Sequence, residues 1–196
     1  NVLFHSDIAQ ALIGEKLNLG DLNFDGASIS GHKIHGPKGI GLLICNNDPD
    51  MLLEPILHGG LQEQNVRSGT TPVFLAVGIA NAMRILYEDH TKNKNYILSL
   101  KKEFVGEIQK NKNLKINFHL ENSHPGLLNI SLEGDIDSNL FCTRLGDRIA
   151  VSTAAACSGI NFEYSHVLRS MGFNEKIIRS SIRLCFGRQN TPEEAR

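Results

Sequence analysis

The sequence of 196 residues has few cysteines, and these are widely spaced: Cys45, Cys142, Cys157 and Cys185. They form no Cys-x-x-Cys motif and no dense disulfide framework. Free thiols in a reducing compartment are the simpler interpretation. Eight histidines are present, but none belongs to a His-Glu-x-x-His motif or to a Cys/His ligand cluster, so the sequence predicts no metal site.

Long apolar runs and a charge of one sign are also lacking. No run approaches the roughly 20 apolar residues of a membrane helix, and the first residues lack the pattern of a signal peptide. The net charge is −1, so no bulk field draws the chain to nucleic acid or to an anionic membrane. Hydrophobic residues make up 41% and charged residues 21%, an ordinary globular balance. We therefore expect a cytoplasmic protein with no membrane partner and no direct nucleic-acid partner.

Both ends have features of an excerpt from a longer polypeptide. The first residues, Val2–His5, are an apolar segment with no preceding cap. The last residues contain Thr191-Pro192-Glu193-Glu194, which is typical of a helix start: threonine as N-cap, proline in the first turn, and acidic residues near the N-terminus. We expect the chain to continue beyond this sequence.

Short apolar runs alternate with glycine and aspartate over the first 45 residues. The pattern predicts a short helix over Ile8–Ile13 and strands over Val2–His5, Phe24–Ser28 and Gly39–Cys45. A polar loop, Gly59–Thr71, precedes a long helix that starts at Pro72. Strands alternating with helices predict an α/β architecture, in which ligands bind at the C-terminal ends of strands.

A second helix, around Leu98–Ile108, leads to the polar and basic segment Asn111–Lys115, a candidate domain boundary. After it, the sequence predicts a second, α+β layer with strands and helices over Lys115–Leu120, Leu127–Leu132, Asp137–Leu145, Ser165–Met171, Glu175–Ile178 and Ser180–Cys185. We therefore expect two domains, residues 1–111 and residues 112–196.

A lysine between flexible glycines is the first candidate for chemistry. Lys33 stands in the segment Ser30–Gly39, after a predicted strand. Its compact amine on a long stem could form an imine with an aldehyde cofactor. Ser30 and His32 could donate hydrogen bonds to a phosphate. Taken alone, this motif is also consistent with a surface turn, and it lacks the Gly-Lys-Ser/Thr ending of a Walker loop.

Asp7 is the second candidate, because it follows the first predicted strand. A pyridoxal cofactor needs a carboxylate against its ring nitrogen, so that the ring accepts electrons from a carbanion. Gln10, three residues on, could hydrogen-bond a ring oxygen. Asp7 could instead be a helix N-cap before Ile8, and both roles could hold together.

Five motifs in order along the chain resemble the cofactor-binding half of cysteine desulfurases, which belong to the class V aminotransferase group: Phe4–Gln10, Ser30–Gly41, His58–Glu63, Arg67–Thr70 and Ser180–Arg183. The resemblance implies a fold type I, PLP-dependent transferase. Residues 1–111 would be the C-terminal part of the large domain with its mixed sheet. Residues 112–196 would be an α+β small domain that carries the catalytic cysteine.

The resemblance also implies pyridoxal 5'-phosphate (PLP) as cofactor and a role for each matching residue. Arg183 would bind the substrate carboxylate, as a guanidinium fork does well, although a structural salt bridge is the alternative. Lys33 would bind the cofactor covalently and move protons. The other cofactor contacts would come from Asp7, Gln10, Ser30 and His32 and, across a dimer interface, from Thr70.

Small residues surround Cys157 in the segment Ser152–Ile160, which suggests an accessible thiol. The resemblance assigns the persulfide-forming role to this cysteine, because it precedes the segment Ser165-His166-Val167-Leu168-Arg169, in the long-loop form of the iron–sulfur-cluster and nitrogen-fixation type. The apolar surroundings of the other three cysteines, Cys45, Cys142 and Cys185, predict core thiols.

The function implied is that of a cysteine desulfurase, which converts L-cysteine into L-alanine and a persulfide on Cys157. The sulfur acceptor would be an iron–sulfur scaffold or a tRNA- or DNA-thiolation protein, and the enzyme would be a homodimer. The family's cofactor-stacking histidine belongs to an N-terminal portion outside this sequence. Two alternatives stay open: a selenocysteine lyase or other class V transaminase, and a non-catalytic platform for sulfur delivery.

Overall fold

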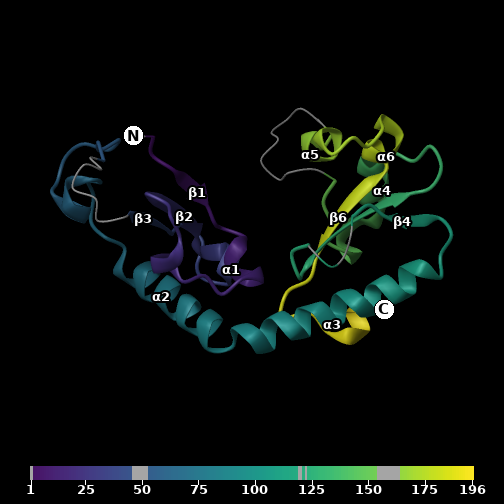
Figure 1. The fold of residues 1–196 in the computed structure, drawn as a ribbon, viewed down its shortest axis with the longest axis horizontal. Coiled ribbons are helices and arrows are strands. Elements are labelled where there is room, and N and C mark those ends of the chain that lie inside the picture. Colours follow the sequence, from purple (N-terminus) through teal and green to yellow (C-terminus); the bar gives the residue numbers. More distant parts are fainter. Residues whose placement is uncertain (1, 46–52, 119–120, 122, 154–163) are drawn as a thin grey trace. The chain divides into compact units, whose positions relative to one another are not determined.

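The computed structural model describes residues 2–45, 53–118, 121, 123–153 and 164–196. The chain forms two compact units, Asn1–Thr91 and Lys92–Arg196, each with its own three-stranded sheet (Figure 1). The units divide some 20 residues before the domain boundary predicted at residue 111, because the helix that ends at Gln109 packs with the second sheet. The division into domains 1–111 and 112–196 concerns the complete protein and stays a prediction.

The first unit is a small mixed sheet with one long helix. Its elements in order are β1 (His5–Asp7), α1 (Ala11–Gly14), the 3₁₀ turn η1 (Leu19–Asp21), β2 (Gly26–Ser30), the 3₁₀ turn η2 (Gly31–Ile34), β3 (Gly41–Cys45), the 3₁₀ turn η3 (Gln62–Asn65) and α2 (Val73–Glu88). Strand β2 is central. It pairs in parallel with β1, with His5 opposite Gly26, and antiparallel with β3, with Ser30 opposite Gly41. The mixed sheet expected from the sequence is present.

The core of this unit lies between β2 and α2. Ala27 and Ile29 alternate along β2, and both are buried because a strand presents every second side chain to one face. Helix α2 contributes Ile79, Ala82 and Leu86, which recur at helical spacing on one face. Ile8, Leu12 and Ile34 complete the cluster. Burying a side chain such as Ile34, which is 1% exposed, stabilises the fold by about 2 kcal/mol.

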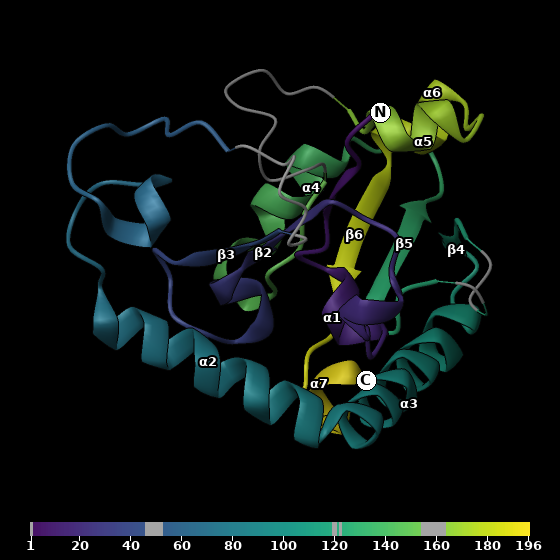
Figure 2. The same ribbon diagram turned by 60° about the vertical axis from the view of Figure 1, so that its left-hand side comes forward.

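The second unit is an antiparallel sheet packed on a 20-residue helix. Its elements are α3 (His90–Gln109), β4 (Leu114–Ile116), β5 (Leu127–Leu132), α4 (Ser138–Leu145), the 3₁₀ turn η4 (Gly146–Arg148), α5 (His166–Ser170), α6 (Glu175–Arg179), β6 (Ser181–Cys185) and α7 (Pro192–Ala195). Figure 2 shows β4, β5 and β6 side by side, with β5 in the middle.

Alternating apolar residues of β5 form the core of the second unit. Leu128, Ile130 and Leu132 lie on one face of the strand and pack with Val105 and Ile108 of α3. Ile182 of β6 joins them directly opposite Ile130. The opposite face of β5 carries the polar residues Asn129 and Ser131, which are buried and hydrogen-bonded.

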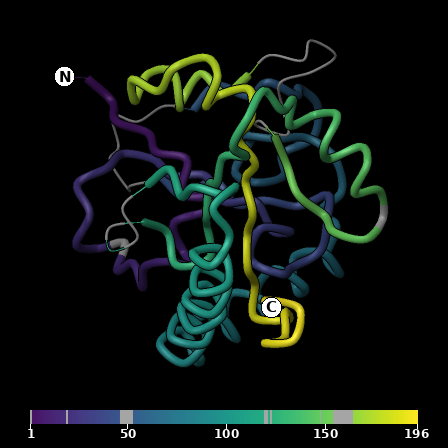
Figure 3. The backbone as a smooth tube through the Cα atoms, turned by 90° about the vertical axis from the view of Figure 1, so that its right-hand side faces the viewer, coloured from purple at the N-terminus to yellow at the C-terminus, as the bar shows by residue number. Residues whose placement is uncertain are grey.

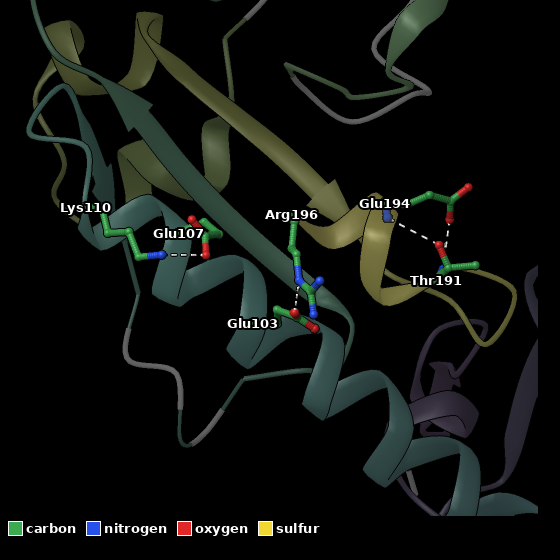
Figure 4. A network of polar contacts seen from close by, with 6 residues as sticks. All are labelled: Glu103, Glu107, Lys110, Thr191, Glu194 and Arg196. Atoms are coloured by element: carbon green, nitrogen blue, oxygen red, sulfur yellow. Dashed lines mark hydrogen bonds and ion pairs between the residues drawn. The ribbon is translucent and has the colours of Figure 1, made fainter.

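The last helix is capped as the sequence predicts. Thr191 is the N-cap of α7, its hydroxyl accepts from the backbone N–H of Glu194, and the Glu194 carboxylate accepts from the Thr191 N–H in return (Figure 4). Arg196 then reaches Glu103 of α3. In Figure 3 the yellow tube of β6 continues to the C-terminus, which lies beside the teal helix α3.

Several sequence-based assignments in the described residues are wrong. The strand predicted over Lys115–Leu120 is β4, which ends at Ile116. Strand β1 begins at His5 and not at Val2, because the ladder with β2 begins at the pair His5 and Gly26, and the Phe4 N–H donates to the Asp25 carboxylate instead of a strand carbonyl. The side chains of Val2 and Phe4 are exposed. The N-cap of α1 is Gln10 and not Asp7, since the helix begins only at Ala11. Cys185, at the end of β6, is exposed rather than a core thiol, whereas Cys45 and Cys142 are half-buried.

Candidate active site

The Lys33 turn is closed by backbone hydrogen bonds and needs glycine at position 31. The Gly31 N–H donates to the Ile40 carbonyl at 3.0 Å, and the Gly36 N–H donates to the Gly31 carbonyl at 2.9 Å. A Cβ atom at Gly31 would lie 2.9 Å from the carbonyl oxygen of Ile40, closer than real Cβ contacts allow. His35 ends the turn in the left-handed region with φ 62°. The turn is therefore held in one shape.

Two buried residues anchor the backbone of the turn that carries Lys33. Gly31 and Ile34 are buried, whereas His32 and Lys33 are exposed. Helix α2 supports the turn from below, since a Cβ atom at Gly78 would lie 2.7 Å from Cγ of Pro37. The close approach of α2 and the buried Ile34 hold the backbone while the lysine amine stays accessible.

Sheet topology brings Asp7 and the Lys33 turn to one edge. Strands β1 and β2 are parallel neighbours, and Asp7, the last residue of β1, is opposite Ser28. Strand β2 continues to Ser30 and enters the turn with Lys33 directly afterwards. Because paired strands lie about 4.8 Å apart, the carboxyl ends of β1 and β2 present both segments at the same edge. In α/β folds this edge is where ligands bind.

Hydrogen bonds orient the polar side chains at this edge. The Asp7 carboxylate accepts the Ala9 N–H through Oδ1 at 2.9 Å, which fixes its direction. Ser30 Oγ and His32 Nδ1 lie 3.0 Å apart and share a hydrogen bond. Gln10 is exposed at the start of α1, three residues after Asp7. Five predicted site residues thus come from one edge: Asp7, Gln10, Ser30, His32 and Lys33.

Thr70 belongs to the first unit but stands apart from that hydrogen-bonded set. It is exposed, and Gly69 before it has φ +96°. The loop that leads to it is closed by a bridge between Leu57 and Arg67, with the Ser68 N–H on the Leu57 carbonyl at 3.1 Å. In the described part of the chain, no hydrogen bond joins Thr70 to Asp7, Ser30 or Lys33.

Arg183 lies in the second unit, in the middle of β6. Its cross-strand partner is Asn129 of β5, so the two side chains share one face of the sheet. On its other edge Arg183 forms an isolated antiparallel bridge with Ser152: the Arg183 N–H donates at 2.6 Å, and the Ser152 N–H returns a bond at 3.1 Å. The backbone that leads toward Cys157 is thereby fixed next to Arg183.

Cys157 itself lies outside the described residues, in the segment 154–163. The residues on either side of that segment are described, and both make side-chain contacts. Thr153 Oγ1 donates to Asn139 Oδ1 at 2.7 Å, and the Tyr164 hydroxyl donates to Asp137 Oδ2 at 2.9 Å. Tyr164 and Asn139 carry no motif that marks them in the sequence. Asp137 is the first residue of the predicted helix Asp137–Leu145, and an aspartate at a helix start is an N-cap signal.

A buried lysine is a further group that sequence reasoning missed. Lys101 of α3 is 3% exposed, and its Nζ donates to Ser123 Oγ at 2.6 Å and to the His124 carbonyl at 3.0 Å. Burial lowers the pKa of Lys101, and the nearby Cys185 opposes that change. Lys101 thereby holds the turn before β5 in place, so its role is structural.

Two further searches cover the described ranges only. They contain no group of three or more histidine, cysteine or acidic residues placed to hold a metal ion. They also contain no helix with the length and apolar character that a bilayer crossing demands.

The mixed sheet, with the Lys33 turn and the Asp7 carboxylate at one strand edge, indicates the class of protein. The family model for aminotransferase class V matches the chain over residues 1–196. The chain belongs to this family.

Among individual proteins, the chain is 39% identical over 195 residues to the cysteine desulfurase IscS of Rickettsia prowazekii. The alignment covers 99% of this chain and 47% of that protein. Among solved structures, a NifS-like protein matches with a TM-score of 0.86 and 32% identity over 98% of this chain and 49% of that one. The structure of SspA in complex with cysteine matches with a TM-score of 0.74 and 28% identity, over 97% of this chain and 52% of that one.

The fold class predicted from the sequence is confirmed: the chain has the mixed α/β fold of these NifS-like enzymes, fold type I. The chain spans about half the length of the curated relatives that it matches. Its similarity to cysteine desulfurases extends over nearly all of its own residues.

Proposed function

We propose that the complete protein is a PLP-dependent cysteine desulfurase, which converts L-cysteine into L-alanine and a persulfide on Cys157. The observation that carries this proposal is the placement of Asp7 and Lys33 at the shared carboxyl edge of β1 and β2. Relatives named cysteine desulfurase and a related structure with cysteine bound support the reaction and the substrate.

The residues at this edge suit PLP by their chemistry. Lys33 offers an exposed amine for the aldehyde, and the oriented carboxylate of Asp7 suits the ring nitrogen. The bonded pair Ser30 and His32 offers donors for the phosphate, and Gln10 offers an amide for a ring oxygen. When bound, PLP supplies an electron sink for a carbanion at Cα of the substrate.

The reaction then depends on three side chains of this chain. The Arg183 guanidinium binds the substrate carboxylate with two parallel hydrogen bonds. The Lys33 amine accepts the proton from Cα and later returns one. The Cys157 thiolate attacks the substrate sulfur, so that a sulfur–sulfur bond forms while the carbon–sulfur bond breaks and its electron pair goes to carbon. Protonation of that carbon gives L-alanine, and the persulfide stays on Cys157.

The setting of the enzyme is part of the proposal. In the described part of the chain Cys45, Cys142 and Cys185 form no disulfide, as a reducing compartment would maintain, so we place the protein in the cytoplasm. Thr70, exposed on its loop, would contact the PLP phosphate of a second subunit in a homodimer. A sulfur-acceptor protein, such as an iron–sulfur scaffold or a tRNA- or DNA-thiolation protein, would receive the persulfide.

The experiment uses the complete protein with L-cysteine and a thiol reductant. Alanine and sulfide should appear in equal amounts. Cys157→Ser should abolish both and keep the PLP absorbance, whereas Cys185→Ser, which removes an exposed thiol elsewhere, should keep the wild-type rate. Full turnover by Cys157→Ser would exclude the persulfide role and favour a lyase or transaminase. A protein without PLP absorbance would favour a non-catalytic platform.

A further inference from the structure

The first turn of α4 holds a carboxylate with three hydrogen-bond donors. Asp137 is the N-cap of this helix, and its Oδ1 accepts the N–H groups of Asn139 at 2.9 Å and Leu140 at 3.4 Å. Its Oδ2 accepts the hydroxyl of Tyr164 at 2.9 Å. The Asp137 side chain is 21% exposed. The carboxylate therefore joins the helix start to a residue 27 positions further along the chain.

Asn139 makes the matching contact to the other side of the same segment. Its side-chain oxygen accepts the Thr153 hydroxyl at 2.7 Å, and its own N–H is held by Asp137. Thr153 directly precedes the segment 154–163 and Tyr164 directly follows it. Both side chains bind the first turn of α4. Both contacts are partly buried, so water competes less than at the surface.

Charges around Asp137 keep it an acceptor. The hydrogen bond from Tyr164 is the largest cause that lowers the pKa of Asp137, and the backbone N–H bonds and Arg179 act in the same direction. Arg179, at the end of α6, lies 3.7 Å from Asp137 Oδ2. The same phenol raises the pKa of Arg179 through a hydrogen bond. Asp137 is therefore ionised at neutral pH, and its bonds are charge-assisted.

The anchored segment begins beside the proposed substrate clamp. Ser152, directly before Thr153, is held by the backbone bridge to Arg183. Strand β6, which carries Arg183, follows Arg179 after one intervening residue. The contacts of Asp137, Asn139 and Arg183 therefore surround the two ends of the segment that carries Cys157.

We propose that Asp137 and Asn139 are positioning residues for sulfur transfer: they bind Tyr164 and Thr153 on either side of the segment that carries Cys157, and Thr153 follows Ser152, which is bonded to Arg183. This inference rests on the proposed function. These hydrogen bonds hold Thr153 and Tyr164, the described residues between which Cys157 lies in the sequence. Positioning of a reacting group acts on the rate of sulfur transfer rather than on the affinity for L-cysteine.

The test removes one anchoring hydroxyl at a time from the complete protein. Tyr164→Phe and Thr153→Val should each lower kcat for alanine release by roughly 5- to 20-fold, which corresponds to about 1 to 2 kcal/mol. KM for L-cysteine should change less than about twofold, because Arg183 is untouched. The PLP absorbance should not change. Thr153→Ser, which keeps the hydroxyl, should restore the rate.

Matched controls remove the same chemical groups elsewhere in the second unit. Tyr96→Phe removes a phenol that donates to the Asn190 carbonyl at 2.7 Å, and Thr143→Val removes a hydroxyl that donates to the Asn139 backbone at 2.9 Å. Both controls should keep the wild-type kcat. Equal losses in controls and anchor variants, or wild-type rates in the anchor variants, would overturn the proposal.

Amide hydrogen exchange gives a readout that does not depend on activity. Thr153→Val should raise exchange in residues 150–153, and Tyr164→Phe should raise it in residues 164–168, with no change in either control. Unchanged exchange in both anchor variants would also overturn the anchoring. A wild-type protein that releases no alanine would contradict the proposed function, while the exchange result would still decide whether the two ends are held.

Discussion

At the scale of single residues, the chemistry of the proposed site depends on how the backbone presents a few polar groups. Asp7 is fixed by one backbone N–H, and Lys33 is exposed directly before the buried Ile34. The motif identifies the residue types, but not their convergence, which comes from the parallel pairing of β1 and β2. Each role at this scale can therefore be tested by a substitution that keeps the fold.

Asp7→Asn tests the carboxylate at constant size. Asparagine keeps an oxygen that can accept the Ala9 N–H, so the fold should be retained, but it has no charge for the ring nitrogen. We expect kcat of the complete protein to fall by roughly 10- to 1000-fold, about 1.4 to 4 kcal/mol of barrier. Steady-state alanine release measures this, with the melting temperature as a check on folding. A variant with wild-type kcat would exclude the ring-nitrogen role.

At the scale of elements, most of the fold was predictable from local patterns. Strand β5 matches the prediction at both ends, because its apolar run is bounded by a turn before Leu127 and polar residues after Leu132. Helix α4, predicted over Asp137–Leu145, spans Ser138–Leu145, with Asp137 as its N-cap. The errors arise where tertiary pairing decides, as at β1, whose apolar residues Val2–Phe4 precede the ladder that begins at His5.

A glycine-to-alanine change should have opposite effects on stability in the Lys33 turn and in helix α3. At Gly31 a methyl group would lie 2.9 Å from the Ile40 carbonyl, so Gly31→Ala should destabilise the protein by about 1 to 3 kcal/mol. At Gly106, in α3, nothing outside the helix's own backbone lies within 4 Å of the added methyl, so Gly106→Ala should stabilise the protein by about 1 kcal/mol.

Urea unfolding of the two glycine variants beside the wild type measures both effects. A Gly31→Ala variant as stable as Gly106→Ala would show that the turn relaxes freely, contrary to its two closing hydrogen bonds.

At the scale of the whole molecule, the chain spans about half the length of its curated relatives. Local sequence patterns do not predict how residues from its two units contribute to one site. Lys33 and Asp7 belong to one compact unit, and Arg183 belongs to the other. The sequence motifs name these residues in order, but neither periodicity nor spacing shows that Thr153 and Tyr164 attach to one turn of α4. Such contacts join side chains far apart in sequence, and no local signal encodes them.

The proposed homodimer makes a prediction about mixed subunits. If Thr70 acts in the partner's site, Thr70→Ala and Lys33→Ala homodimers should both lose activity at limiting PLP. A mixed dimer should regain one intact site, since the Thr70→Ala subunit keeps Lys33 and receives Thr70 from its partner. Unfolding and refolding the two variants together, followed by an assay of alanine release, tests this. No recovery in verified mixed dimers would place Thr70 in the site of its own subunit.

The most direct measurement asks which lysine of the complete protein carries the cofactor. Borohydride reduction followed by peptide mass spectrometry should find a single phosphopyridoxyl group, on the peptide that contains Lys33. Lys38, exposed five residues further along the same segment, is the internal comparison. A modification at Lys38 or at any other lysine, or none in a protein that shows PLP absorbance, would contradict the assignment of the β1–β2 edge as the cofactor site.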